Sequence, residues 1–226
     1  MSFRILFITA TSSEAEVLKR VRGVMSVPGG YRAGNMEISV LVAGIGSIST
    51  AWAMKQWISI NGKPDLALNI GIAGSYKDEL VAGDVVMPLS DCFADAGVED
   101  GDKFLTLSEA GLTKSDEFPF RKELLLADTR YSVHMKSLLK PVRAITVNTA
   151  TGCESTRIKL INKFNPDIET MEGAAFFYIC TMENIPFLAI RSISNRVEIR
   201  NKNNWNIPLA LEKLSGKLGE VLLTLD

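Results

Sequence analysis

Residues 4–14 read RILFITATSSE, and this stretch sets the pattern from which the fold is predicted. Its largely apolar part, residues 4–8, has the length of a buried β-strand, and a polar segment that ends at Glu14 follows directly. The apolar part is too short for the hydrophobic core of a signal peptide with its flanks. We therefore interpret residues 4–8 as the first strand of a central sheet and residues 9–14 as the loop that leaves it.

Similar apolar runs recur along the chain, and segments with helical spacing lie between several of them. The runs show little alternation of polar and apolar residues, which is typical of strands buried on both faces of a mainly parallel sheet. Strands that alternate with helices indicate a doubly wound α/β fold. We predict a single domain, residues 1–226, with a mixed, mainly parallel central sheet and helices on both faces. The predicted strands are 4–8, 38–42, 66–70, 85–87, 142–147 and 187–193, the predicted helices are 13–21, 47–60, 172–182 and 208–223, and residues 93–130 form a long excursion near the site or a subunit contact.

The composition favours a globular protein that acts on a small molecule. Hydrophobic residues make up 46% of the 226 residues, enough for a full core. The formal net charge of -1 gives no basis for electrostatic capture of nucleic acid or of an anionic membrane. No uncharged stretch approaches the roughly 18 residues of a membrane span. We expect a cytoplasmic protein that binds neither nucleic acid nor membrane.

The cysteines and the histidine do not form a metal site or a disulfide framework. Cys92, Cys153 and Cys180 are odd in number and widely spaced, so we expect buried free thiols. His134 is the sole histidine, which fits a surface or structural position, and no pair of cysteines has the spacing of a zinc site. The chain also lacks a phosphate-binding loop and the full dinucleotide fingerprint. We therefore expect no metal and no organic cofactor.

Polar and glycine-rich segments follow the predicted strands. Ligands of open α/β sheets bind beyond the carboxyl ends of the strands, so these segments predict one binding site. Each also has a structural alternative, because Gly44-x-Gly46 and Gly71-x-x-Gly74 are typical of tight turns. Glu14 and Glu172 also fit acids in the first turn of a helix, where the helix dipole stabilises them. The segments are 9–14, 43–47, 71–75, 148–152, 170–173 and 194–196.

Four motifs resemble the nucleoside phosphorylase superfamily, in the same order and over nearly the whole chain. They are Gly71-Ile72-Ala73-Gly74, Gly83-Asp84-Val85-Val86, Glu169-Thr170-Met171-Glu172-Gly173-Ala174-Ala175 and Arg191-Ser192-Ile193-Ser194-Asn195. The stronger resemblance is to the hydrolase branch, which includes methylthioadenosine/S-adenosylhomocysteine nucleosidases and futalosine hydrolases. Residues 93–102, and residues 194–197 continuing to Arg200 and Trp205, look most like futalosine hydrolases. The resemblance implies a nucleoside phosphorylase-like fold and cleavage of the N-glycosidic bond of a purine nucleoside.

The resemblance also implies a role for each matching residue. Glu172 accepts hydrogen bonds from the 2′- and 3′-hydroxyls of the ribose, Met171 packs on the sugar, and the negative charge favours an oxocarbenium-like transition state. Glu14 holds the attacking water and takes its proton. Arg191 lies near this water and Glu172. The other substrate-binding positions implied are Ile72, Ala73, Gly74, Ser194 and Trp205.

Water is favoured over phosphate as the nucleophile. Phosphorylases of the superfamily carry arginines in the first loop and before the glycine loop, and this chain has neither. Residues 9–14 hold no basic residue, and Asn69 and Ile70 precede Gly71. The negative charge of Glu14 would repel phosphate. A helix N-terminus can bind phosphate without arginine, so phosphorolysis of inosine or a related nucleoside stays open as an alternative.

Asn195 favours a 6-oxopurine as the leaving base. The methylthioadenosine nucleosidases that this segment resembles carry aspartate at this position, which donates a proton towards N7 of adenine. An asparagine amide donates hydrogen bonds through its NH2 group and does not ionise, which suits the two acceptors N7 and O6 of hypoxanthine. The residue therefore indicates a 6-oxopurine. Together with the resemblance to futalosine hydrolases, this implies futalosine as the substrate, an inosine-like nucleoside that is cleaved to hypoxanthine and dehypoxanthine futalosine in menaquinone biosynthesis.

The contacts to the 5′ extension and to the purine face stay open. Trp205 lies near the position where the related nucleosidases place an aromatic residue over the 5′ group of the substrate. Arg196 or Arg200 suits pairing with the carboxylate of futalosine. The related nucleosidases stack an aromatic on the base from the loop that corresponds to residues 149–153, which has none here. The Gly152 backbone or a residue of 93–120 is the expected replacement.

Two further expectations concern assembly and function class. The resemblance implies a homodimer, and Trp52 and Trp57 on the second predicted helix fit an apolar contact. A purine-binding protein without catalysis is a further alternative, because a fold does not fix a function. The combination of Glu14, Glu172 and Arg191 argues against it, since a binder has no need to position water.

Overall fold

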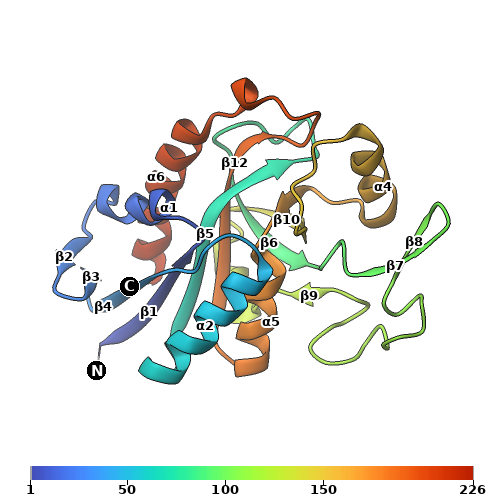
Figure 1. Cartoon of the computed structure of the whole chain (residues 1–226). Helices are drawn as coiled ribbons and strands as arrows, with labels where there is room; N and C mark the ends of the chain where they lie inside the picture. The colour runs from blue at the N-terminus through green and yellow to red at the C-terminus, as the bar shows by residue number, and fades with distance from the viewer. Residues whose placement is uncertain (1, 226) are drawn as a thin grey trace.

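The computed structural model of the chain describes residues 2–225 and places a ten-stranded sheet between two layers of helices (Figure 1). At its centre β4, β1, β5 and β12 run parallel, and β6, β10 and β11 continue the sheet on one side. All six predicted strands are present, so the mixed, mainly parallel sheet is confirmed. The bounds are β1 (Phe3–Thr9), β4 (Met36–Val42), β5 (Leu66–Ser75), β6 (Val85–Asp91), β10 (Lys140–Thr146), β11 (Ile168–Thr170) and β12 (Phe187–Arg196).

The sheet closes on itself at one end, which the sequence did not indicate. β11 pairs in parallel with β10 and antiparallel with β5, where Glu169 lies opposite Gly74. This pairing brings the segment that precedes Glu172 next to the far end of β5. The short strands at the margins are β2 (Met25–Val27), β3 (Gly30–Ala33) and β9 (Leu125–Leu126), of which β9 pairs with β6.

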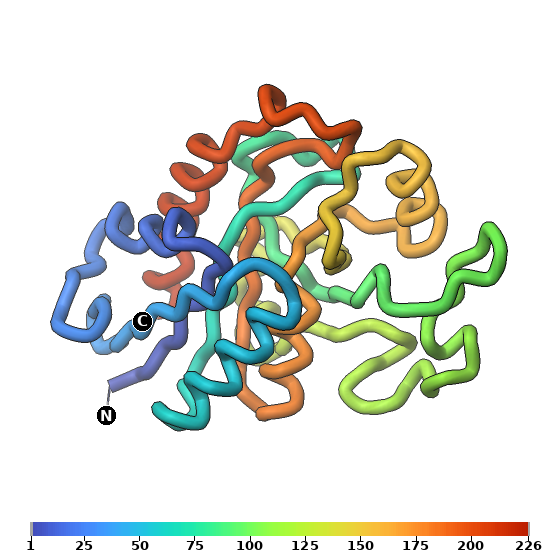
Figure 2. Tube along the Cα trace, viewed as in Figure 1, coloured from blue at the N-terminus to red at the C-terminus, as the bar shows by residue number. Residues whose placement is uncertain are grey.

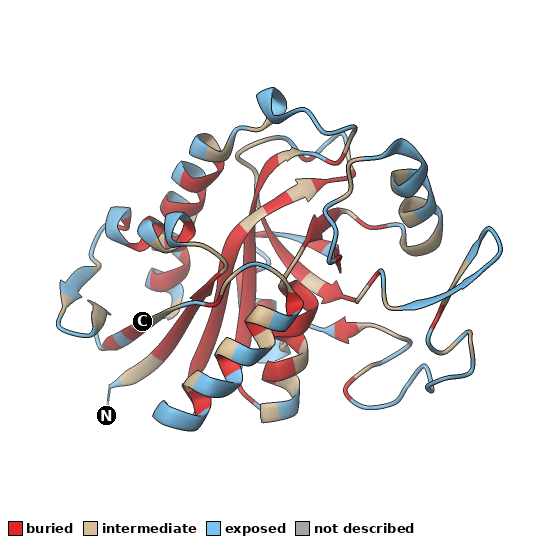
Figure 3. Cartoon of the chain, in the orientation of Figure 1, coloured by how far each residue is buried: buried red, intermediate tan, exposed pale blue. Residues whose placement is uncertain are grey.

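Helices cover both faces of the sheet, as predicted. Successive side chains of a strand point to opposite faces, so Ile5 and Phe7 belong to one core cluster and Leu6 and Ile8 to the other. Figure 3 shows the buried residues concentrated in the sheet and on the inner sides of the helices. The first cluster includes η1 (Glu16–Arg20), α3 (Thr129–Met135) and α6 (Ile207–Leu225), and the second includes α2 (Ser47–Asn61) and α5 (Gly173–Glu183).

Several elements differ from the prediction. The predicted helix 13–21 is a single α-helical turn, α1 (Ser12–Ala15), followed by the 3-10 helix η1. The excursion carries the hairpin of β7 (Gly97–Asp100) and β8 (Lys103–Thr106), which projects from the body of the protein (Figure 2). The helix α4 (Glu154–Phe164) and the short η2 (Lys202–Asn204) were not predicted. No residue of α4 is fully buried, and it packs against the core only through the partly buried Leu160, Ile161 and Phe164, so its apolar pattern is short.

The cysteine prediction is right for two of the three residues. Cys92 and Cys180 are buried, whereas Cys153 is exposed at the N-cap of α4. Across residues 2–225 the longest apolar helices fall short of what crossing a membrane requires.

Candidate active site

The predicted residues gather at the carboxyl ends of β1, β5 and β12, although two segments are not the loops that were expected. Residues 71–74 lie inside β5, which continues to Ser75, and Asn195 lies inside β12. Both segments were expected to follow their strands, but the strands extend several residues beyond their apolar runs and include them. The polar residues therefore stand on the sheet itself.

Glu14 is fixed by a reciprocal cap at the start of α1. The Thr11 hydroxyl accepts the N–H of Glu14 at 3.3 Å, and Glu14 Oε2 accepts the Thr11 N–H and hydroxyl, each at 2.9 Å. Glu14 Oε1 accepts the N–H of Ile72 on β5 at 3.1 Å. The residue is 7% exposed. A carboxylate has about four lone-pair sites, so these three bonds leave one site on Oε1 for a ligand.

Gly71 makes room for this carboxylate. A Cβ atom at this position would lie 2.6 Å from Glu14 Oε1, closer than real contacts allow. The glycine is therefore required by close approach inside a strand, and the tight turn that was its alternative explanation is absent. Arg191 also lies close to this position, because its Nε is 3.9 Å from the Cβ position of Gly71.

We expect Gly71→Ala to destabilise the protein, because the new methyl group pushes Glu14 off Ile72. Overpacking of this kind costs about 1–3 kcal/mol of unfolding free energy, to be measured by urea denaturation. Gly216→Ala in α6 is the matched control, since nothing lies within 4 Å of its Cβ position. Alanine there should be neutral or stabilising by up to about 1 kcal/mol. Equal stabilities of the two variants would show that the Gly71 contact is not tight.

Glu172 precedes α5, and its side chain accepts a hydrogen bond from the loop before α2. Its Oε1 accepts the N–H of Gly46 at 2.9 Å, and the carbonyl of Met171 accepts the Ser47 hydroxyl at 3.3 Å. Burial raises the pKa of Glu172, and the Gly46 N–H and the charge of Arg191 oppose that rise. Glu172 stands at the N-cap of α5, yet its side chain does not cap that helix. The carboxylate is thus directed towards the sheet edge.

Arg191 is a buried cation on which the charges of Glu172 and Glu14 act. It is 2% exposed, and its Nη1 donates to the carbonyl oxygens of Asn69 (2.7 Å) and Ile190 (3.1 Å), while Nη2 donates to the side-chain oxygen of Asn69. Burial lowers its pKa, and the charges of Glu172 and Glu14 counteract this. Asn69, which holds Arg191, was not among the predicted site residues. A polar residue inside an otherwise apolar strand was the sign of it in the sequence.

Asn195 stands next to a β-bulge. The pairing of β12 with β5 shifts between Ile193, opposite Ala73, and Asn195, opposite Gly74, so that Ser194 has no partner residue. Bulges of this kind re-aim side chains near functional sites. The Ser194 hydroxyl donates to Asn195 Oδ1 at 2.7 Å, and Asn195 Nδ2 donates to the Arg196 carbonyl at 2.8 Å. One N–H of the amide is left for a ligand.

Arg196 and Arg200, the two candidates for binding the carboxylate of the substrate, are in different surroundings. Arg196 is exposed and forms an ion pair with Asp78. Arg200 is exposed beside the loop that lacks the expected aromatic, since a Cβ atom at Gly152 would lie 3.4 Å from Arg200 Cβ. Trp205 is half-buried, and the neighbouring Asn206 donates its N–H to the Ser194 carbonyl at 2.8 Å, which places this segment beside the bulge.

A buried cluster that the sequence analysis missed anchors the loop of residues 149–153. Glu169 accepts the hydroxyl of Tyr76 at 2.6 Å, and it accepts the N–H and hydroxyl of Thr151 at 2.9 and 2.5 Å. Glu169 pairs with Gly74 across the closed end of the sheet, so the loop is held over the end of β5. This depends on the closure of the sheet, which left no signal in the sequence.

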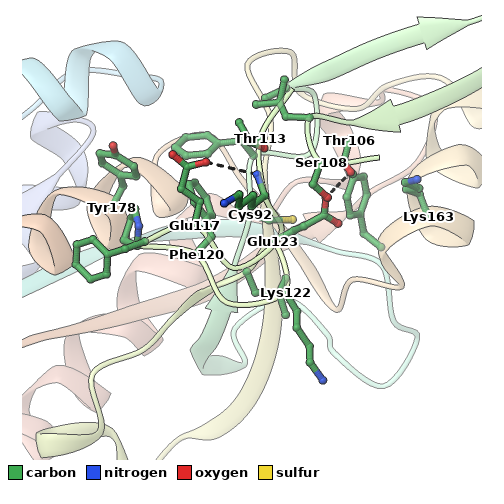
Figure 4. Close-up of a pocket in the computed structure, with 18 residues that line it drawn as sticks. Cys92, Thr106, Ser108, Thr113, Glu117, Phe120, Lys122, Glu123, Lys163 and Tyr178 are labelled. Carbon is green, nitrogen blue, oxygen red and sulfur yellow. Dashed lines mark hydrogen bonds between the residues drawn. The ribbon is translucent and has the colours of Figure 1, made fainter. Parts of the chain in front are cut away.

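A cavity of about 390 Å³ lies outside this constellation (Figure 4). It is formed by the excursion together with α4 and α5, and its lining includes Cys92, Phe120, Glu123, Lys163 and Tyr178. The hydroxyls of Thr106 and Ser108 point to Glu123 within it. None of the predicted site residues lines it.

Comparison with known proteins places the chain in a family. The model of the phosphorylase superfamily matches residues 4–225. A futalosine hydrolase of Acidothermus cellulolyticus is 31% identical in a match that covers 95% of this chain and 88% of the relative. A 5′-methylthioadenosine/S-adenosylhomocysteine nucleosidase of Buchnera aphidicola is 28% identical and covers 91% of this chain and 86% of the relative.

The solved structures show the same fold. A 5′-methylthioadenosine/S-adenosylhomocysteine nucleosidase of Colwellia psychrerythraea, in complex with adenine, superposes with a TM-score of 0.80 at 19% identity. The match covers 100% of this chain and 96% of that structure. Together with the family model, which spans nearly all the chain, this shows that the protein belongs to the phosphorylase superfamily.

Proposed function

We propose that this protein is a nucleosidase that hydrolyses the N-glycosidic bond of a purine nucleoside, and that its substrate is futalosine. The products are then hypoxanthine and dehypoxanthine futalosine, an intermediate on a route to menaquinone. The position of Glu14 carries the proposal, because its carboxylate lies between Gly71, the Ile72 N–H and Arg191. The relatives named futalosine hydrolase and methylthioadenosine/S-adenosylhomocysteine nucleosidase support it.

The residues divide the work of hydrolysis as follows. The free lone pair of Glu14 Oε1 orients the attacking water and takes its proton. Glu172 accepts the ribose hydroxyls, and its negative charge stabilises the cationic sugar as the base departs. Arg191, held by Asn69, brings a buried positive charge to the site, and this charge opposes the rise in the pKa of Glu172. Asn195 donates its remaining N–H to the leaving purine.

The geometry favours water over phosphate. An oxyanion at this edge would need backbone and hydroxyl donors, and the N–H and hydroxyl of Thr11 and the N–H of Ile72 already bind Glu14. A phosphate would also meet the negative charge of Glu14.

Isotopically labelled water tests this step. We expect the label at C1′ of the released sugar, and the same rate with and without phosphate. A sugar phosphate as product, or turnover that requires phosphate, would establish a phosphorylase and remove the proposed role of Glu14.

Arg200 is the better candidate for the carboxylate of futalosine, because Arg196 is already paired with Asp78. We expect Arg200→Ala to raise KM for futalosine about tenfold, the effect of losing roughly 1.4 kcal/mol from one charge-assisted hydrogen bond. Turnover of inosine, which lacks the 5′ extension, should not change. Arg196→Ala is the matched control and should leave both KM values within about twofold. An unchanged KM for futalosine in Arg200→Ala would remove this contact.

We also propose a homodimer formed through the outer face of α2. Ile48 and Trp52 are 83% and 70% exposed there, an apolar area that fits a subunit contact. Trp57, named with Trp52 from the sequence, is instead packed against the second core cluster. Light scattering should give twice the chain mass, and a monomer would contradict the dimer.

A further inference from the structure

Asp91, the last residue of β6, is a buried acid that has no part in the scheme above. It is 1% exposed, and its Oδ1 accepts the N–H of Cys92 at 2.8 Å and the hydroxyl of Thr146 at 2.9 Å. Within residues 2–225 its Oδ2 has no hydrogen-bond partner. Burial of a carboxyl with an unpaired oxygen is unfavourable for stability, so we asked which part of the site Asp91 holds in place.

Thr146 connects Asp91 to the first turn of α5. Its Oγ1 accepts the N–H of Ala174 at 2.7 Å while it donates its proton to Asp91. The N–H of Gly173 is taken by the Thr170 hydroxyl at 3.2 Å. The first N–H groups of a helix have no partner inside the helix, so these hydroxyls supply the cap. Asp91 orients the hydroxyl that holds Ala174.

This cap replaces the one that Glu172 would otherwise provide. Glu172 occupies the N-cap position, where an acidic side chain commonly bonds the next N–H groups. Its carboxylate instead bonds the N–H of Gly46 on the other side. Because Thr146 and Thr170 cap the helix, the side chain of Glu172 is released for the sheet edge.

Asp91 also touches the backbone next to Glu172. A Cβ atom at Gly173 would lie 2.1 Å from Asp91 Oδ2, so the carboxyl rests directly against the first residue of α5. A negative charge there is favoured by the helix dipole. Any shift of Asp91 is therefore passed to the residue that follows Glu172.

The electrostatics couple the same groups. Burial raises the pKa of Asp91 to about 7, the bonds from Thr146 and Cys92 oppose this, and so does the charge of Arg191 on β12. The charge of Glu172 at the start of α5 raises the pKa further. Asp91 thus belongs to one buried charge cluster with Arg191 and Glu172.

We propose that Asp91 is a positioning residue for Glu172. Through the Thr146 hydroxyl and its contact with Gly173, it holds the first turn of α5 so that the Glu172 carboxylate faces Gly46 and the substrate. The inference rests on the proposed function for what Glu172 does to the ribose, but the position of Glu172 is measurable without any substrate.

The experiment compares Asp91→Asn, Thr146→Val and Thr146→Ser with the wild type. Hydrogen exchange of the Ala174 and Gly46 amides by NMR reports the cap and the Glu172 contact directly. The pH profile of kcat with a 6-oxopurine nucleoside reports the ionisation of Asp91. Asp128→Asn is the matched control, because Asp128 caps α3 through the Arg130 N–H at 2.8 Å and lies outside the site.

We expect Asp91→Asn and Thr146→Val to speed exchange of both amides about threefold to tenfold, the effect of one weakened hydrogen bond. Turnover should fall about 10- to 100-fold through misplacement of Glu172. Thr146→Ser keeps the hydroxyl and should retain wild-type values, as should Asp128→Asn.

The wild-type kcat should rise through about pH 7 as Asp91 ionises, because the charged carboxylate binds the Thr146 proton more strongly and favours a cationic sugar. Asp91→Asn should lose this step and Asp128→Asn should keep it. A step that persists in Asp91→Asn would show that ionisation of Asp91 is not its cause. Wild-type amide exchange together with a wild-type pH profile in Asp91→Asn would overturn the inference. If the wild type released no base from any nucleoside, the proposed function would fall, and the amide exchange would still decide the role of Asp91.

Discussion

Replacement of Glu14 by glutamine is expected to lower kcat by about 10²–10⁴-fold, the usual contribution of a general base. Glutamine has the same shape but cannot take the proton of the attacking water. Its NH2 group must also face N–H and O–H donors, since both oxygens of Glu14 accept hydrogen bonds from Thr11 and Ile72. Substrate binding depends mainly on other residues, so the substrate Kd should change little. Single-turnover kinetics and calorimetry measure the two quantities separately.

Glu16→Gln is the control for Glu14→Gln. Glu16 is two residues away and forms an exposed ion pair with Lys19 at 2.6 Å. Exposed pairs contribute little, so this variant should keep wild-type turnover. Full activity of Glu14→Gln would remove the residue from the mechanism, and loss of binding together with turnover would indicate that Glu14 is structural.

Asn195→Asp is expected to lower kcat for a 6-oxopurine nucleoside by about 10²–10³-fold, the effect of losing one donor to developing negative charge. The free amide N–H, which we propose bonds the leaving base, is replaced by an oxygen, which repels N7 and O6 of hypoxanthine. The same change should improve cleavage of methylthioadenosine, because a protonated carboxyl suits the N7 acceptor of adenine. The ratio of kcat/KM for the two substrates is the measurement.

Asn203→Asp is the control for the added charge, since Asn203 is exposed in η2. It should leave the ratio unchanged. A ratio that does not respond to Asn195→Asp would show that purine selection lies elsewhere, for example in the loop that Glu169 anchors.

The strand-edge rule and the resemblance located much of the candidate site from the sequence. Glu14, Arg191 and the residues of β5 do meet at one sheet edge, because the carboxyl ends of parallel strands lie together. The sequence did not reveal that Gly71 and Asn195 stand inside strands. Both strands continue through polar or glycine residues, whose own propensities oppose a strand, and pairing between β5 and β12 overrides them.

The role of Asp91 and the closure of the sheet could not be predicted from the sequence, for a different reason. The partner of Asp91 is Thr146, 55 residues later, and the pairing of β11 with β5 brings Glu169 to Gly74. Such contacts depend on register between distant segments, and local periodicity carries no information on it. The helix α4 was missed because only the partly buried Leu160, Ile161 and Phe164 pack against the core, which leaves a short apolar pattern.

Chromatography of the products from futalosine, inosine and methylthioadenosine, each with and without phosphate, shows whether the protein hydrolyses a 6-oxopurine nucleoside. We expect hypoxanthine from futalosine at a rate that does not depend on phosphate, and little or no adenine from methylthioadenosine. Adenine as the main product would contradict the role of Asn195, and strict dependence on phosphate would contradict the role of Glu14.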